Sequence, residues 1–308
     1  MTAQSLARFA ETFEEVSNFR GAPLQSNRMR TIAAADITSA VRDLYSTCCV
    51  EVRPDYKAAL EKAQKTEVSP LGRQILGTML ENYKIAETDR SPMCQDTGFP
   101  VVFVKIGQDI RVEGDLGAAI QEGLRQGTKQ GFLRGSLVRD PLSRAPNTGD
   151  NTPGIVHYDI VPGEKLRIDV LAKGGGSENK SRLYMLKPND GIDGIRNAVR
   201  ETVSLAGPDA CPPFVVGVGV GGTFDKCAEL AKKALMRIIG STNADPAADK
   251  LEKELEAELN KLGVGPQGMG GSTTTVGVFI ETHPVHIASF PVAVNIQCNA
   301  NRHRGMDL

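Results

Sequence analysis

Three of the six cysteines in this 308-residue chain stand in turn-rich segments beside polar side chains, where a thiol could do chemistry. They are Cys94 in MCQDTG, Cys211 in DACPP and Cys298 in IQCNANRHRG. Because they lie far apart in the sequence, no Cys-x-x-Cys pair marks a metal site. Their context alone leaves two interpretations open, a buried thiol or a metal ligand.

The other three cysteines, Cys48, Cys49 and Cys227, fall within segments that we expect to be helical. A cysteine in such a place usually behaves as a small buried hydrophobe. The chain starts without the apolar run of a secretory signal, so a disulfide framework is not expected either. We therefore predict six free thiols.

A carboxylate and an amide follow the first of the turn cysteines. Asp96 could donate or accept a proton, and Gln95 offers hydrogen bonds to a ligand. The same Asp-Thr-Gly sequence could equally be an Asx-type turn without a function. Both interpretations stay open at this stage.

Three consecutive glycines, Gly174–Gly176, precede the residues SENK. Backbone N–H groups in such a run can approach an anion closely, and Lys180 would add charge. The run is not a P-loop, because no Gly-Lys-Ser/Thr follows at the required spacing. The alternative is a mobile surface loop.

Single basic residues give weaker indications. Arg134 could pair with a carboxylate through both of its terminal nitrogens, although arginines usually lie at the surface. His286 lies in an apolar, strand-like segment, where a histidine is more often structural. The run Arg302–Arg304 is most simply a solvated basic tail.

A dinucleotide-binding interpretation arises from Gly217, Gly219 and Gly222, which match G-x-G-x-x-G between a strand and a helix. We disfavour it, because no second strand ending in an acidic residue follows and no βαβ alternation is visible. The glycines are better interpreted as a turn directed at a substrate carboxylate or at Cys211.

Hydrophobic periodicity predicts the elements that must position these residues. Helices are expected at 33–52, 71–86, 115–130, 191–206, 225–238 and 246–262, with Asp115 as a cap. Strands are expected at 101–106, at 214–222, in a hairpin across 157–172 and near the C-terminus, and 139–154 should be a loop. The fold class is α/β, with a helical N-terminal part followed by a mixed sheet with packed helices. We expect one domain, 1–308, with 1–90 mainly helical and 91–308 carrying the functional loops.

Composition excludes some partners. Lys and Arg number 36 against 37 Asp and Glu, and Trp is absent, so neither nucleic acid nor an anionic membrane is an expected partner. No apolar run is long enough to span a membrane. We expect a cytoplasmic protein.

Several long blocks resemble the class I fumarases and the related tartrate dehydratases. They are CQDTG, KGGGSENKS, ACPPFVVGVGVGGTFDK, GPQGMGGSTTTVGV and HIASFPVAVNIQCNANR. The resemblance implies a 4Fe–4S cluster bound by Cys94, Cys211 and Cys298, with one iron open to a small dicarboxylate. It also implies substrate contacts at the positions Gln95, Asp96, Arg134, Gly175 and His286. Asp96 would be the general acid, and His286 would help to hold the substrate.

Single-chain members of that family continue into a second domain, whereas this chain ends shortly after Cys298. The resemblance therefore implies the α subunit of a hetero-oligomeric hydro-lyase, whose β subunit supplies the rest of the active site. GGGSENKS favours fumarate over tartrate as the substrate. The alternatives are a tartrate dehydratase subunit, an NAD-dependent oxidoreductase, and an iron–sulfur sensor without a substrate.

Overall fold

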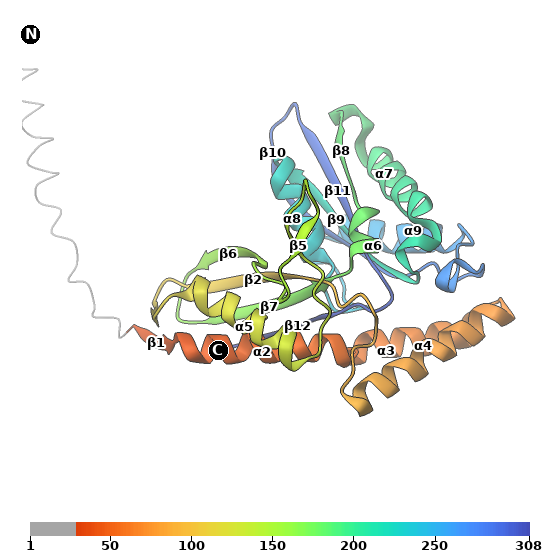
Figure 1. The fold of residues 1–308 in the computed structure, drawn as a ribbon. Helices are drawn as coiled ribbons and strands as arrows, with labels where there is room; N and C mark the ends of the chain where they lie inside the picture. The colour runs from red at the N-terminus through yellow and green to blue at the C-terminus, as the bar shows by residue number, and fades with distance from the viewer. Residues whose placement is uncertain (1–28) are drawn as a thin grey trace, which may run out of the picture.

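The computed structural model describes residues 29–308 as a mixed α/β fold, which confirms the predicted class (Figure 1). A helical N-terminal part comes first, and two four-stranded sheets with packed helices follow. The part of the predicted helical region that falls on residues 1–28 lies outside the described residues. No helix in the described part is both long enough and apolar enough for a membrane crossing.

The predicted helices are confirmed with small changes at their ends. Proline occupies the first turn of three of them, where its missing N–H costs nothing. The side chain of Asp115 accepts a hydrogen bond from Ala118 N at 2.9 Å, as expected for an N-cap. The helices are α2 (Ala34–Val50), α3 (Pro54–Thr66), α4 (Pro70–Asp89), α5 (Leu116–Gln130), α6 (Gly175–Asn179), α7 (Gly191–Ala206), α8 (Phe224–Ala234) and α9 (Pro246–Asn260).

The first sheet has the order β12-β7-β2-β6, and α2 packs on it together with α5. Its strands are β2 (Phe99–Gly107), β6 (Ile155–Val161), β7 (Leu166–Lys173) and β12 (His303–Asp307). The predicted hairpin at 157–172 is wrong, because β6 and β7 each pair with β2 and not with each other. The buried apolar run of β2 makes β2 a central strand, which lies between β6 and β7. The chain after β6 therefore crosses the end of β2 to reach β7.

The second sheet has the order β10-β9-β11-β8, with strands β8 (Arg182–Leu186), β9 (Phe214–Gly222), β10 (Thr275–Val285) and β11 (Phe290–Gln297). Helix α8 covers one face of this sheet (Figure 1), and α7 and α9 pack on it through a separate apolar cluster. Strands β9 and β10 are parallel, so a crossover through α8 and α9 does follow the glycine motif. The sequence analysis did not detect this βαβ unit.

The motif glycines have a packing function that differs from the prediction. Gly217 and Gly219 lie inside β9, and a Cβ on either would be 2.0 Å from a backbone oxygen of α8. Glycine therefore lets the helix lie directly on the strand. The expected turn directed at Cys211 is wrong, because Cys211 precedes β9 while the last glycines lie at the other end of the strand.

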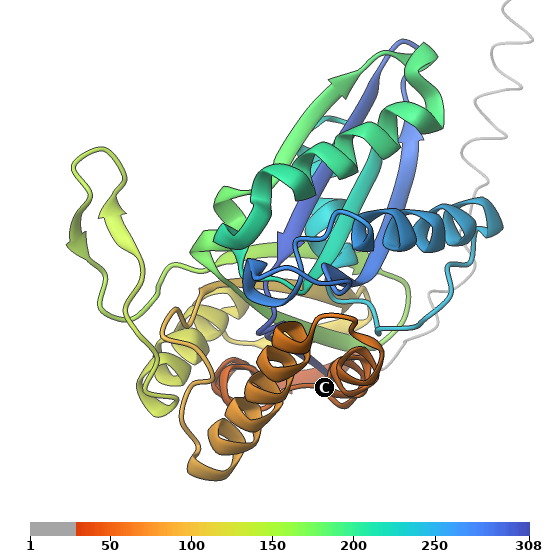
Figure 2. The same ribbon diagram turned by 90° about the vertical axis from the view of Figure 1, so that its right-hand side faces the viewer.

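Smaller elements complete the fold. Strand β1 (Arg30–Ala33) pairs with β3 (Ile110–Glu113). The segment 139–154, predicted to be a loop, contains a short hairpin of β4 (Val138–Asp140) and β5 (Ala145–Asn147), which projects from the molecule (Figure 2). Three 3-10 turns are η1 (Pro188–Asp190), η2 (Gly207–Ala210) and η3 (Pro266–Gly268).

One apolar cluster joins the two sheets to the α3–α4 pair. It includes Tyr83 of α4, Leu171 of β7, Val215 of β9 and Phe279 of β10, all at most 5% exposed. Since residues of both sheets share this core, we propose that the described chain forms one domain. Cys94 and Cys298 pack against this cluster, so these two cysteines lie at the junction of the two sheets.

Candidate active site

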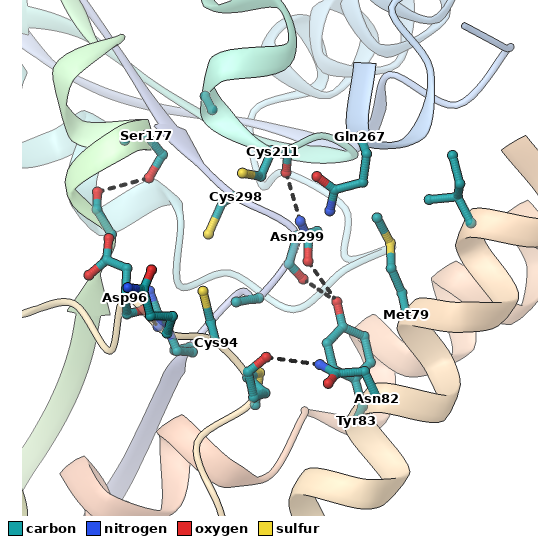
Figure 3. Close-up of a pocket in the computed structure, with 18 of the residues that line it drawn as sticks. Met79, Asn82, Tyr83, Cys94, Asp96, Ser177, Cys211, Gln267, Cys298 and Asn299 are labelled. Atoms are coloured by element: carbon teal, nitrogen blue, oxygen red, sulfur yellow. Dashed lines mark hydrogen bonds between the residues drawn. The ribbon is translucent and has the colours of Figure 1, made fainter. Parts of the chain in front are cut away.

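The three turn cysteines line one cavity of about 750 Å³. Cys94 follows α4, Cys211 lies between η2 and β9, and Cys298 directly follows β11. Their sulfur atoms point toward one shared space (Figure 3). The structure therefore brings together three thiols that are far apart in the sequence.

The other three cysteines are buried, as predicted. Cys48 and Cys49 in α2 are 1% exposed, and Cys227 in α8 is fully buried. None of them lines the cavity.

Asn299 links two of the cysteine loops. Its backbone N–H and its side-chain Nδ2 each donate to Cys211 O at 3.0 Å, and Tyr83 Oη donates to Asn299 O at 2.8 Å (Figure 3). The Cys94 loop is fixed by its neighbour, because Asn82 Nδ2 donates to Met93 O at 2.8 Å. These hydrogen bonds hold the backbone of the cysteine loops in place.

Burial raises the pKa of the Cys94 thiol, against the lowering effect of nearby Arg302. Burial also raises the pKa of the Cys211 thiol, and the neighbouring Cys298 adds to this rise. Both thiols are therefore protonated at neutral pH without a metal. Metal binding must displace these protons, which makes it pH-dependent.

Asp96 lies beside the thiols, and two backbone amides fix its carboxylate. Gly98 N donates to Oδ1 at 2.9 Å, and Gly175 N donates to Oδ2 at 2.8 Å. The bond from Gly98 N forms the Asx-type turn that the sequence left as one of two interpretations. Asp96 therefore makes this turn and also lines the cavity. Each oxygen keeps a lone pair for a ligand or a proton.

The glycine run forms the N-terminal turn of the short helix α6. Gly174 and Gly176 line the cavity, and Gly175 reaches Asp96 instead of an external anion. Lys180, which the sequence suggested as the charged partner, instead pairs with Asp209 at 2.6 Å.

A second lysine, Lys173, was missed in the sequence because it ends an apolar strand. Its ammonium is fully buried and donates to Ser177 Oγ at 2.7 Å, with Glu178 at 3.4 Å. Burial lowers the pKa of Lys173 to about 8, against the raising effect of Glu178. Lys232 also pairs with Glu178, at 2.6 Å.

The predicted solvated tail at Arg302–Arg304 is wrong. Arg302 is 1% exposed and lines the cavity, and His303 is 3% exposed. Burial lowers the pKa of His303 to about 3, and Arg53 beside it contributes. The reason is the pairing of β12 with β7, which covers these side chains. One sequence signal could have indicated this burial: Arg302–Arg304 directly continue the block around Cys298, IQCNANRHRG.

The remaining predicted contacts separate into two groups. Gln95 lines the cavity. Arg134 does not; its side chain is exposed, while its backbone N–H donates to Thr97 Oγ1 at 3.0 Å. His286 lies in an exposed loop between β10 and β11, at the end of β11 opposite Cys298. An eight-residue strand spans roughly 26 Å, so the chain does not bring His286 to the thiols.

A single metal ion does not fit this arrangement. Within residues 29–308, no three His, Cys, Asp or Glu side chains are close enough to hold one ion. Sulfur ligands of one ion lie within about 4 Å of one another, because metal–sulfur bonds are about 2.3 Å long. An iron–sulfur cube is larger, and its thiolates bind different irons. Three thiols that face one cavity, beside the unpartnered donors of Arg302, fit a cluster better.

Comparison with known proteins extends over almost all of the chain. A family model described as fumarate hydratase (Fumerase) matches residues 38–307. A putative L(+)-tartrate dehydratase subunit alpha of Methanocaldococcus jannaschii is 44% identical over 272 residues, covering 86% of this chain and 95% of its own. L(+)-tartrate dehydratase subunit alpha of Escherichia coli K12 is 34% identical over 281 residues, covering 90% of this chain and 92% of its own.

Proposed function

The chain belongs to the fumarate hydratase (Fumerase) family, as the resemblance predicted, and on this premise we propose that it is the cluster-bearing α subunit of a hydro-lyase for a four-carbon dicarboxylate. The observation that carries the proposal is the convergence of Cys94, Cys211 and Cys298 on one cavity beside the fixed carboxylate of Asp96. The two α-subunit relatives support it.

Cys94, Cys211 and Cys298 would hold a 4Fe–4S cluster by one thiolate each. When bound, the cluster supplies a Lewis acid for the substrate hydroxyl. The chain supplies three loops that Asn299, Tyr83 and Asn82 keep in place, so little ordering is needed on binding.

Asp96 acts as the general acid in this proposal. Dehydration needs a proton delivered to the leaving hydroxyl oxygen, and hydration needs the same proton removed from the attacking water. The two amide donors from Gly98 and Gly175 hold the carboxylate in one orientation, with its free lone pairs available. Gln95 lines the same cavity and offers an amide to a substrate carboxylate.

A partner must complete the site. Met269, which lines the cavity, is 62% exposed, and Leu71, one turn before the cavity-lining Ile75 of α4, is 49% exposed. These side chains form an apolar margin. We propose that a β subunit covers this margin and adds the remaining substrate-binding groups. Arg134 and His286 do not line the cavity, so they would contact substrate only where another chain completes a binding site next to them. The six free thiols suit a reducing compartment such as the cytoplasm.

Two substrates remain candidates. The fumarate/malate pair is the first, because of the GGGSENKS block. L(+)-tartrate is the second, because both relatives carry that substrate in their names. Malate and tartrate differ by a single hydroxyl group, and the shape of the pocket must distinguish them.

The test is anaerobic production of the chain with its β partner, followed by iron and sulfide analysis. Conversion of malate to fumarate is then compared with dehydration of L(+)-tartrate, and the larger kcat/KM identifies the substrate. The chain alone should be inactive. A preparation with iron and sulfide but no dehydration of either acid would favour a sensor, and nicotinamide-dependent turnover without iron would favour the oxidoreductase.

A further inference from the structure

Arg302 has an unusual environment for a buried guanidinium. It is 1% exposed and lines the cavity with the thiols. Its Nη1 donates to the backbone oxygen of Asp96. Its Nε and Nη2 have no hydrogen-bond partner among residues 29–308.

No carboxylate of the described chain forms an ion pair with Arg302. Lys173, another buried cation, differs in this respect, because Glu178 lies 3.4 Å from its ammonium. A buried charge without a counter-charge costs several kcal/mol, of the order measured when one partner of a buried pair is removed. The structure thus leaves Arg302 with only the unpaired Asp96 carboxylate near its charge, and with two free donor nitrogens that an anion can meet.

The position of these donors indicates where that anion lies. A Cβ on Gly174 would be 3.2 Å from Nη2 of Arg302 and 3.4 Å from Oδ2 of Asp96, so glycine keeps the space beside Nη2 open. Cys298 lies four residues before Arg302, and both residues line the cavity. The two free donors of Arg302 therefore belong to a side chain that shares the cavity with the three thiols.

Two anions could occupy this place, the thiolate-bound cluster or a substrate carboxylate. The cluster is favoured because Arg302 is shielded from solvent and held to the Cys94–Asp96 loop by the Nη1 bond. A guanidinium that shares the cavity with the three thiols would offset the negative charge that they acquire when they bind a cluster.

We propose that Arg302 is a positioning residue that donates its free N–H groups to the iron–sulfur cluster and stabilises the cluster's added negative charge. This inference rests on the function proposed above. Donors to cluster sulfur and nearby positive charge raise the reduction potential of such clusters. The same contact should slow the loss of iron, because Arg302 stabilises the assembled cluster relative to the site without a cluster.

The test compares wild type with Arg302→Met and Arg302→Gln, each produced anaerobically with the β partner. Arg304→Met is the matched control: it removes one positive charge two residues further along the chain, but Arg304 pairs with Glu51 at 2.7 Å and does not line the cavity. Iron and sulfide are quantified first. Each sample is then titrated with dithionite, which delivers one electron to each cluster. Electron paramagnetic resonance follows the reduced cluster during the titration and gives the midpoint potential.

Both Arg302 variants should show a lower midpoint potential and several-fold faster iron loss in air, with Arg304→Met like wild type. The Gln variant keeps an N–H for the Asp96 oxygen, so it decides the question if the Met variant does not fold. A wild-type potential in a loaded Gln variant overturns the proposal. A raised KM for substrate in the Arg302 variants, with an unchanged midpoint potential, also overturns the proposal. That result would show that Arg302 binds the substrate and not the cluster. If wild type itself binds no iron and sulfide, the proposed function fails, and that result is distinct.

Discussion

The backbone N–H of Gly175 donates a hydrogen bond of 2.8 Å to Oδ2 of Asp96, across 79 residues of sequence. This bond joins the cysteine loop after α4 to the glycine run at the start of α6. Together with Gly98 N it fixes the carboxylate at the edge of the cavity. Two motifs that were separate in the sequence thus form one site.

Asp96→Asn should lower turnover of the loaded, partner-bound enzyme by about 10²–10⁴-fold, since an amide cannot transfer the proton. Iron and sulfide content should stay near wild type, because the cysteines are unchanged. Steady-state rates with malate, read beside the iron analysis, check this.

The control for that change is Asp209→Asn. Asp209 lines the same cavity, but its side chain is 65% exposed and pairs with Lys180. We expect little change in rate. Equal losses in the two variants would show that cavity charge, and not the proton of Asp96, is what matters.

Cys298→Ala should prevent assembly of an intact cluster, because one of three proposed thiolates is lost. The expected result after anaerobic reconstitution is a strong fall in bound iron and sulfide and in visible absorption. Cys227→Ala is the matched control, since Cys227 is buried on the inner face of α8 and does not line the cavity. Wild-type iron content in Cys298→Ala would remove this cysteine from the ligand set.

Glu67 fixes the glycine-rich loop that lines the cavity with Gln267 and Met269. It accepts hydrogen bonds from Ser69 N at 2.9 Å and from Ser272 N at 2.8 Å. Glu67→Gln should lower the free energy of unfolding by about 1–2 kcal/mol at neutral pH, because it replaces the charged acceptor of these hydrogen bonds with a neutral and weaker one. Urea denaturation measures this, with the exposed Glu81→Gln of α4 as a control near zero.

The same carboxylate should make stability depend on pH. Burial alone would raise the pKa of Glu67, but the hydrogen bonds from Ser69 and Ser272 outweigh it and lower the pKa from 4.5 to about 2. The stabilisation is therefore complete above pH 4.5 and is lost as pH falls toward 2. The difference in unfolding free energy between wild type and Glu67→Gln should shrink across this window. A constant difference would contradict the assignment.

Gly219→Ala should destabilise the second sheet by about 1–3 kcal/mol, because the new Cβ would be 2.0 Å from the backbone oxygen of Cys227. Gly117→Ala in α5 is the control, since its nearest contact would be an ordinary 3.4 Å. It should be neutral or stabilising by up to about 1 kcal/mol. Thermal unfolding distinguishes the two. Equal midpoints would mean that α8 can move off β9 freely.

The sequence predicted most elements correctly where periodicity was strong. Helix 191–206 is confirmed at both ends by α7, and 71–86 lies inside α4. The predicted hairpin at 157–172 failed because strand pairing depends on which apolar run is central, and local alternation carries no information about that. The interpretation of Gly217 and Gly219 as a turn failed for a similar reason, because the contact that requires glycine comes from α8.

For the site, residue types and flanks alone separated Cys94, Cys211 and Cys298 from the three buried cysteines. They also identified the family, since long blocks with unusual glycine and cysteine patterns are specific. Only the tertiary structure could place Arg302 inside the cavity and His286 at the far end of β11, because side-chain burial is decided by strands that pair across the whole chain. Sequence determines which chemical groups are present; folding decides which of them meet, because distances between residues far apart in the chain are set by packing.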